Sequence, residues 1–186
     1  MKRLFLFVVL AIALVGCGSV ATQSTPIPDA DSALQTVDKS GNQPGLSFTY
    51  PTGWELLEAD MRGLMVYSVP DAGLRLYSPG LTAGEVVIQV SATPRARVES
   101  DLASYAISLV EMTDSTHQDP QPVTINGFEG YQAVGERDEF TILVTVTEQY
   151  GEIVEVVAYT TPDEAETHRP MIDALIESAI WKLPTE

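Results

Sequence analysis

Cysteine is nearly absent from this chain of 186 residues, which contains one, Cys17. A single thiol excludes an intramolecular disulfide framework and a zinc site built from several cysteines. Basic residues are also scarce, with 10 Lys and Arg against 26 Asp and Glu and a formal net charge of −16. Nucleic-acid binding needs clustered Lys and Arg, so we expect no nucleic-acid partner. The same shortage argues against attachment to anionic lipid through basic patches.

The chain has no apolar run long enough to span a bilayer as a mature helix. The run from Leu4 to Val15 follows Lys2 and Arg3, and it is shorter than the roughly 20 residues that a spanning helix requires. A short basic segment followed by such a run is typical of a secretory signal peptide. We therefore predict a signal peptide over residues 1–16.

The end of this segment predicts a lipid anchor. Leu14-Val15-Gly16-Cys17 matches a bacterial lipobox, in which the cysteine thiol receives a diacylglyceryl group and the chain is cut just before it. The new amino terminus usually receives a further acyl chain, such as palmitate. Each buried CH₂ contributes about 0.8 kcal/mol, so two or three chains hold a protein at a membrane. We predict lipidation at Cys17 and a location on the extracytoplasmic face of the cell membrane; the alternatives are a plain signal peptide with an incidental cysteine, or an uncleaved anchor helix.

Residues 17–44 are predicted to be the lipidated cysteine and a flexible linker, with a turn of helix near Ala33-Leu34 and Val37 as an alternative. The segment is rich in Ser, Thr, Gln, Pro, Gly and Asp and has too little apolar surface to offset the entropy of ordering. Cleavage would remove Lys2 and Arg3 but no acid, leaving 8 basic residues against 26 acidic ones, a net charge of −18. Charge would then repel the domain from anionic lipid.

Residues 45–186 are predicted to form one α+β domain. Alternating apolar residues and turn signals indicate strands, and a stripe at three- and four-residue spacing from Leu102 to Val110 indicates a helix over 99–112. The Asn126-Gly127 pair is the strongest short hairpin signal. The predicted strands cover 46–50, 63–69, 74–77, 85–92, both arms of a hairpin within 123–134, 139–149 and 153–160, and the stretch 136–139 is predicted to be a turn.

A closing helix is predicted after Thr161-Pro162-Asp163-Glu164, where Thr161 is placed to cap it and Glu164 to complete a capping box. Pro170 interrupts this span, so the helix is either kinked there or begins near Thr167. Strands, a helix, a meander and a closing helix indicate an antiparallel sheet with helices packed against it.

The order of motifs resembles the PsbP-like family over residues 44–183. A first strand ends in Tyr50-Pro51-Thr52-Gly53-Trp54, and a strand over 123–125 leads through Asn126-Gly127 to Gly130-Tyr131. The closing helix ends in Ser178-Ala179-Ile180-Trp181. The resemblance implies an antiparallel sheet with helices on both sides and a role as an accessory binding protein, as in the extrinsic photosystem II protein, a Ran-binding transport factor and Lpq-type envelope lipoproteins. No family active site maps onto this chain.

Two histidines are the candidate metal ligands, and each has a simpler interpretation. His117 lies in the loop 114–119, which offers oxygen and imidazole ligands, although calcium favours a denser set of acids. We interpret this loop as solvated. His168 follows Glu164 by four residues and suits an ordinary ion pair or a surface site. We predict no metal, no cofactor and no catalytic residue.

Motifs for catalysis are missing as well. No Gly-x-Ser-x-Gly turn, P-loop or dinucleotide fingerprint occurs, and a glycosidase pair of acids cannot be inferred from composition. Trp54 and Trp181 offer rings for stacking on a ligand, but each sits at an element boundary and is expected to close an end of the core. The sequence thus predicts a non-catalytic, membrane-anchored lipoprotein that binds a protein partner or helps an envelope complex assemble. The alternative is a small-ligand or cation-binding lipoprotein with a pocket between helix and sheet, and an envelope hydrolase is the weakest candidate.

Overall fold

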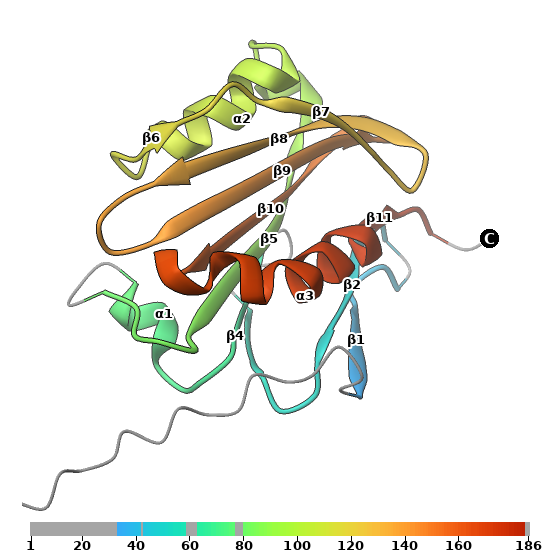
Figure 1. Ribbon diagram of the computed structural model, residues 1–186. Helices are drawn as coiled ribbons and strands as arrows, with labels where there is room; N and C mark the ends of the chain where they lie inside the picture. Colours follow the sequence, from blue (N-terminus) through green and yellow to red (C-terminus); the bar gives the residue numbers. More distant parts are fainter. Residues whose placement is uncertain (1–32, 42, 59–62, 77–79, 185–186) are drawn as a thin grey trace, which may run out of the picture.

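The computed structural model describes residues 33–41, 43–58, 63–76 and 80–184, and the fold is built from two antiparallel sheets and three α-helices within those ranges (Figure 1). The larger sheet has eight strands in the order β3-β4-β5-β10-β9-β8-β6, with β7 also pairing with β8. Its strands are β3 (Glu55–Glu58), β4 (Gly63–Tyr67), β5 (Val86–Pro94), β6 (Thr116–His117), β7 (Gln121–Ile125), β8 (Phe128–Glu136), β9 (Thr141–Gln149) and β10 (Glu152–Thr160). The predicted α+β class with a large antiparallel sheet is confirmed.

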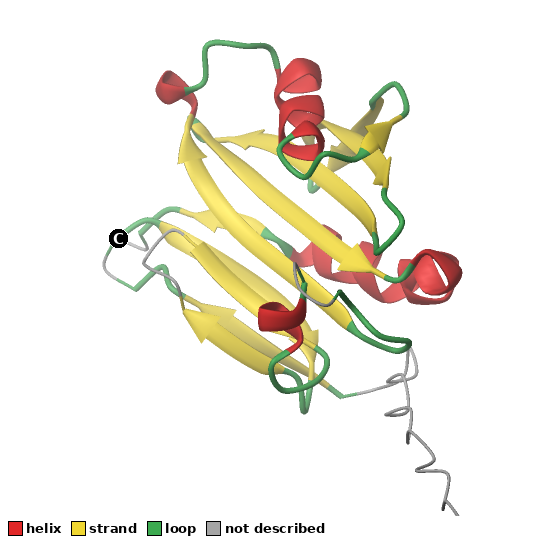
Figure 2. Ribbon diagram, turned by 90° about the vertical axis from the view of Figure 1, so that its left-hand side faces the viewer, coloured by secondary structure: helices red, strands yellow, loops and turns green. Residues whose placement is uncertain are grey.

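Helices lie on both faces of this sheet. One face is covered in part by α2 (Leu102–Glu111), which packs on β8 and β9, and by the short α1 (Ala72–Arg75) near β4 and β5 (Figure 2). The opposite face is covered by α3 (Ala165–Ser178) together with a three-stranded sheet of β1 (Leu34–Asp38), β2 (Gly45–Pro51) and β11 (Ile180–Lys182), in the order β1-β2-β11. Short 3₁₀ turns, Arg95–Arg97 and Pro162–Glu164, precede α2 and α3.

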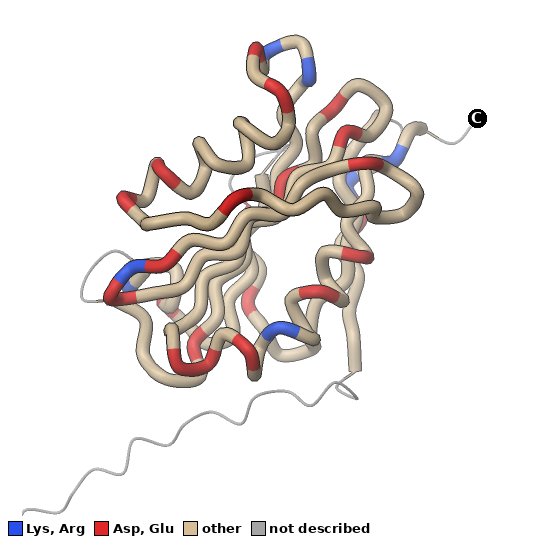
Figure 3. Tube along the Cα trace, turned by 45° about the horizontal axis from the view of Figure 1, so that its top comes forward, with Lys and Arg blue, Asp and Glu red and all other residues tan. Residues whose placement is uncertain are grey.

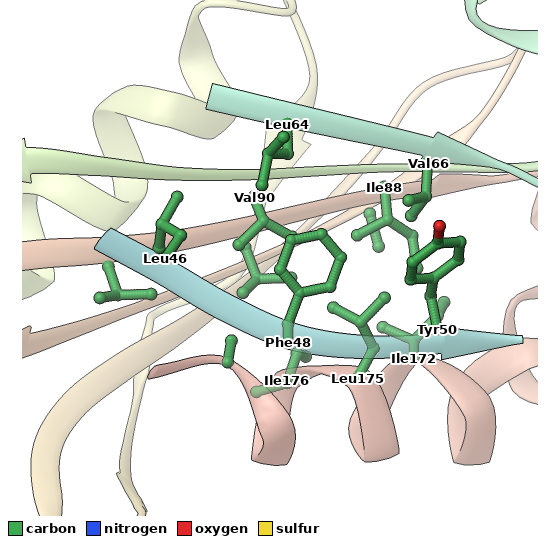
Figure 4. Close-up of a cluster of buried hydrophobic side chains, with 14 of the residues drawn as sticks. Leu46, Phe48, Tyr50, Leu64, Val66, Ile88, Val90, Ile172, Leu175 and Ile176 are labelled. Carbon is green, nitrogen blue, oxygen red and sulfur yellow. The ribbon is translucent and has the colours of Figure 1, made fainter. Parts of the chain in front are cut away.

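The main core fills the space between β2, α3 and the large sheet (Figure 4). Alternate residues of β2 point into it, and the apolar stripe of α3 closes it from the other side. Every second residue of a strand and every third or fourth residue of a helix lie on the same face, so the apolar faces of β2 and α3 pack against each other. The labelled core residues are Leu46, Phe48, Tyr50, Leu64, Val66, Ile88, Val90, Ile172, Leu175 and Ile176.

Both tryptophans belong to this core. Trp54, just after β2, and Trp181, in β11, are 6% and 5% exposed. Both rings are therefore part of the core rather than exposed for stacking on a ligand.

The hairpin predicted at Asn126-Gly127 joins β7 to β8. Asn126 and Gly127 have φ values of 54° and 80°, the two positive angles that a type I′ turn demands. The Asn126 side-chain Nδ2 also donates to the Glu177 carbonyl oxygen at 2.7 Å. One residue thus sets the turn and attaches it to the end of α3.

The linker prediction is wrong for its last part. Residues 34–38 form β1, which pairs with β2 in a register of Leu34 opposite Pro51, and Val37 is buried in the main core. A polar segment of this kind becomes ordered by hydrogen bonding to the free edge of a neighbouring strand, here β2, and composition alone does not show that such an edge exists. The ordered part of the chain therefore begins before residue 45. Residues 1–32, with the predicted signal peptide and Cys17, lie outside the described residues.

Other elements also differ from expectation. The predicted strand at 74–77 is replaced by α1, in which Leu74 is 78% exposed while Ala72 is buried. Strands β3 and β11 were not predicted, and α3 ends at Ser178 rather than continuing through Ile180. The segments β3, α1 and β11 are only three or four residues long. Such short segments take their conformation from neighbouring strands rather than from their own pattern.

The start of α3 also departs from the predicted capping box. The helix runs from Ala165 through Pro170 to Ser178, and the Thr161 hydroxyl bonds the Glu164 carboxylate instead of capping the helix. That carboxylate also accepts a bond from the backbone N–H of Gly84. Glu164 therefore joins α3 to the loop before β5.

Candidate functional site

An open groove lies where the loop after α2, the β8–β9 turn and the start of α3 meet. Its volume is about 770 Å³. The loop contributes Asp114, Thr116 and Gln118, the turn contributes residues of the predicted stretch 136–139, and α3 contributes Ala165 and Glu166. The turn between β8 and β9 covers residues 137–140, one residue later than the predicted stretch 136–139, because Glu136 ends β8. The fold thus brings three distant parts of the chain to one surface.

A narrow slot continues from the groove, under α3. The two cavities share Val134, Thr141, Ala165 and Glu166. The slot has a volume of about 80 Å³. Apolar residues from the sheet and the helix form most of its wall, namely Val134, Leu143, Ala158, Ala165 and Ile172. This pocket has the position between helix and sheet that the alternative hypothesis required.

Acidic residues dominate the groove. Asp114, Glu136, Asp138 and Glu166 line it together with one base, Arg137. Figure 3 shows acidic positions on the loop after α2, at the β8–β9 turn and at the start of α3. The groove therefore has a negative charge that bulk solvent only partly screens.

Arg137, the one basic residue of the groove lining, is held by contacts with the loop after α2 and with its own turn. Its Nη1 donates to the Thr113 carbonyl oxygen at 3.0 Å, and its Nε lies 2.9 Å from Glu139 Oε2. The guanidinium carbon is 5.9 Å from the centre of the Phe140 ring, within the range of a cation–π contact. These contacts fix the turn and direct the charge of Arg137 toward Glu139, so the groove lining in the described part of the chain keeps a net negative charge.

A polar network stands at the slot, beside its apolar wall. Arg169 donates from Nη2 to Gln132 Oε1 at 2.6 Å and from Nε to Asp173 Oδ1 at 2.8 Å. Gln132 in turn donates to Thr145 Oγ1 at 3.0 Å. Because Arg169 lines the slot and is bonded to β8 through Gln132, this network holds α3 at a fixed distance from β8.

Thr160 supplies an unpaired polar group at the slot. The residue is 3% exposed and lines the slot, and its hydroxyl has no hydrogen-bond partner in the described part of the chain. A buried polar group without a partner costs about 1–3 kcal/mol. A hydrogen-bonding group that entered the slot from outside would reduce this cost.

His168 is buried, contrary to the prediction of a surface site, while Glu164, four residues earlier, is its nearest acid, as the predicted pairing implied. His168 is 1% exposed, and neither ring nitrogen has a hydrogen-bond partner among the described residues. The closest acid, Glu164, lies 3.7 Å from Nε2, too far for a hydrogen bond. Burial lowers the pKa of His168 from its ordinary 6.5, and the neighbouring Glu164 only partly opposes this shift. Its role is in the core of the fold.

His117 lies at the surface, as expected. Its Nε2 is 3.5 Å from Glu111 Oε1, and its Nδ1 is 3.4 Å from the Gln118 carbonyl oxygen. Across the described ranges, no group of three or more His, Cys, Asp or Glu side chains is placed to hold a metal ion. Among the helices of those same ranges, none combines the length and the apolarity needed to cross a bilayer.

Sequence reasoning missed a buried carboxylate on the α2 side of the sheet. Glu155 is 7% exposed and accepts hydrogen bonds from Ser91 Oγ and Tyr105 Oη, both at 2.8 Å. Burial, followed by the charge of Glu155, raises the pKa of Tyr105 to about 12. Glu155 lies opposite Ser91 because of the register between β10 and β5. Its bond from Tyr105, 50 residues earlier in the chain, depends on where α2 packs on the sheet. The cluster attaches α2 to the sheet.

The arrangement of sheets and helices is similar to that of a solved PsbP protein. CyanoP, the cyanobacterial PsbP of Synechocystis, aligns with a TM-score of 0.53 and 16% identity over 91% of this chain and 99% of that chain. LpqN, involved in cell envelope biogenesis of Mycobacterium tuberculosis, aligns with a TM-score of 0.47 and 16% identity over 82% of this chain and 93% of that one. PA94, a protein of unknown function from Pseudomonas aeruginosa, aligns with a TM-score of 0.44 and 14% identity over 77% of this chain and 99% of that one. No protein-family model and no curated protein sequence matches the chain.

These comparisons define a class by fold. The likeness to CyanoP covers nearly the whole of both chains, so the chain has a PsbP-like α+β fold. The two other TM-scores lie below 0.5, and this assignment does not depend on them. At 16% identity the likeness concerns the fold alone, because one fold hosts many functions.

Proposed function

We propose that this protein is a lipid-anchored accessory protein of the cell envelope, which binds a protein partner outside the cytoplasmic membrane and does not catalyse a reaction. Two independent features support the proposal. The lipobox ending at Cys17 supplies an anchor without a spanning helix, and the PsbP-like fold supplies a rigid domain with an open groove.

The observation that carries the proposal is the groove of about 770 Å³ formed by the loop after α2, the β8–β9 turn and α3. Its wall comes from elements that are fixed by the sheet, by the Arg137 contacts and by the Arg169 network. A preformed surface loses little entropy on binding, which favours recognition of a partner. Its polar lining and wide opening suit a protein segment better than a buried cofactor.

The anchor is tested with the variant Cys17→Ser in the native host. We expect wild-type protein to sediment with the membrane after cell disruption and to partition into detergent. We expect the variant to lose the lipid and to resist cleavage by the lipoprotein-specific signal peptidase. Ser19→Ala, two residues away, is the matched control and should behave as wild type. A Cys17→Ser protein that is cleaved at the same site and still sediments with the membrane would contradict the anchor.

The partner is tested by mild crosslinking of the wild-type chain in intact membranes, followed by purification and mass spectrometry. We expect one or a few envelope proteins to be enriched above the level found with an unrelated lipoprotein expressed to the same amount. Equal recovery of all proteins from both samples would contradict the binding role.

A small-ligand site in the slot is the second candidate. The unpaired hydroxyl of Thr160 and the position of the slot between α3 and the sheet favour it. Calorimetry with calcium, manganese and zinc tests the cation version, and heat that saturates at a defined stoichiometry would support it. An absence of heat with all three ions would leave only uncharged or organic small ligands. An envelope hydrolase remains the weakest candidate.

A further inference from the structure

We infer that the groove and the slot together bind a basic segment of the partner protein, with one aliphatic side chain of that segment inserted into the slot. This inference rests on the proposed function, because it names the chemistry of the partner at the same site. Three observations support it, namely the charge of the groove, the shape and lining of the slot, and the composition of the rest of the chain.

Charge selects the kind of segment. Four acids line the groove with one arginine, and Arg137 bonds to Thr113 and lies beside Glu139. A partner segment with Lys or Arg would meet complementary charge, whereas an acidic segment would be repelled. Complementary charge sets which partner binds and how fast it associates.

Shape selects what enters the slot. A volume of about 80 Å³ has room for several water molecules at about 10–15 Å³ each, and is far smaller than the roughly 300 Å³ or more of an ordinary cofactor pocket. Its wall includes Val134, Leu143, Ala158 and Ile172. One aliphatic side chain would release water from this apolar wall, and an anchor residue buried in a pocket typically dominates the affinity of an interface.

Polar groups stand where the main chain of such a segment would pass. Thr141 and Glu166 belong to both cavities, and the unpaired Thr160 hydroxyl lines the slot. The N–H and C=O groups of an extended segment are donors and acceptors that suit these side chains. The aliphatic anchor and the basic residues would then lie on neighbouring positions of one peptide.

The chain itself is a poor occupant. Residues 17–32 contain no Lys or Arg and include Asp29 and Asp31, so the groove would repel the chain's own amino-terminal segment. A second copy would bring 26 acidic residues against 8 basic ones after cleavage. Charge therefore favours a different, basic protein.

The test uses the full chain in its native membrane, with a photoreactive phenylalanine analogue at Gln118, an exposed residue of the groove wall. Thr124, an exposed residue of β7 near the opposite end of β8, is the control position. Neither replacement changes the charge of the protein. We expect peptides crosslinked at position 118 to carry a net positive charge and an aliphatic residue, and to differ from any peptides crosslinked at position 124.

Charge and slot variants complete the test. The double variant Glu136→Lys, Glu166→Lys should lower the crosslink yield at position 118 by about tenfold, and Glu129→Lys, an exposed acid at the other end of β8, should change it by less than about twofold.

Ala165→Leu places a larger side chain where the groove meets the slot, keeps a good helix former, and should also lower the yield. Ala103→Leu on α2 is its control. Thermal unfolding by circular dichroism verifies that each variant folds.

The possible results separate the two proposals. Acidic peptides, the chain's own sequence or an unchanged yield in the double variant at position 118 would overturn the groove inference. Crosslinks to a partner at position 124 alone would overturn it too, while leaving the accessory role intact. An absence of crosslinks at both positions, together with no enrichment from wild-type membranes, would overturn both.

Discussion

At the scale of single residues, His168 is a titratable group that is 1% exposed. Neither of its ring nitrogens has a hydrogen-bond partner within the described ranges, and Glu164 is the charged group that acts on its pKa. Desolvation opposes protonation, so the folded protein holds His168 in the neutral form. The unfolded chain binds a proton at this residue near pH 6.5, and the folded chain binds it only at lower pH.

This difference predicts the pH dependence of stability. As pH falls below about 6.5, the unfolded state takes up a proton that the folded state resists, so the free energy of unfolding falls. His168→Leu removes the group and should abolish the part of this loss that lies above pH 5. At pH 8 it should leave stability equal or higher by up to about 1 kcal/mol, because no hydrogen bond is lost. Urea unfolding at pH 8, 6.5 and 5.5 measures both effects.

His117→Gln is the matched control, since it replaces the other histidine of the chain, which is exposed. Measurements stay above pH 5 because the pKa of Glu164 is lowered by its bond from Gly84, and that group loses its own contribution as pH falls through 4.5 and below. A variant His168→Leu with the same slope as wild type would contradict the assignment.

At the scale of elements, the contact between α2 and β8 depends on a glycine. A Cβ atom at Gly135 would lie 2.2 Å from Val110 Cγ1 and 2.8 Å from Ile142 Cγ2, distances that no well-packed core contains. Gly135 therefore allows α2 to approach the sheet closely. Since the groove begins in the loop directly after α2, this contact also positions one wall of the site.

Gly135→Ala should destabilise the protein by about 1–3 kcal/mol through overpacking. Val110→Ala removes the closest atom and should itself be destabilising, but the double variant should be more stable than the sum of the two losses predicts. A coupling of about 1 kcal/mol is expected for residues in direct contact. Urea unfolding of the four proteins measures it, and strict additivity would show that the helix does not sit on Gly135.

Sequence patterns located the long elements of the fold, including those that border the groove, and missed short elements elsewhere in the fold. The β8–β9 turn at 137–140 and the helix α2 follow from alternation and from the Leu102–Val110 stripe. By contrast, β1, β3, α1 and β11 follow from neighbouring strands that offer an edge or a hydrophobic surface. The groove was not predictable, because its loop, turn and helix are brought together only when α3 packs across the sheet.

At the scale of the whole molecule, acidic charge opposes compaction. The chain from residue 17 onward carries a net charge of −18, and self-repulsion of such a charge weakens the folded state relative to the extended one. The described ion pairs are mostly at the surface, such as Arg95 with Glu148 and Lys182 with Asp38, and each contributes little. Repulsion should therefore outweigh attraction among the exposed charges.

We accordingly expect salt to stabilise the protein. Raising sodium chloride from about 0.01 M to about 0.15 M shortens the Debye length from roughly 30 Å to roughly 8 Å, and the melting temperature should rise. Sucrose at matched osmolality controls for effects other than screening. A melting temperature that falls with added salt would indicate that attractive surface pairs dominate the electrostatic energy.

Composition and local patterns were enough to find the lipobox-like motif at Cys17, the excess of acids, the alternating strands and the two long helices, because each depends on neighbouring residues or on overall composition. Long-range packing is what makes residues 34–38 a strand, buries His168, brings Glu155 to Tyr105, and places four acids along one groove beside an apolar slot. These features join residues far apart in the chain, and which of them meet depends on how α2 and α3 pack on the sheet. Local patterns specify the elements, and packing creates the site.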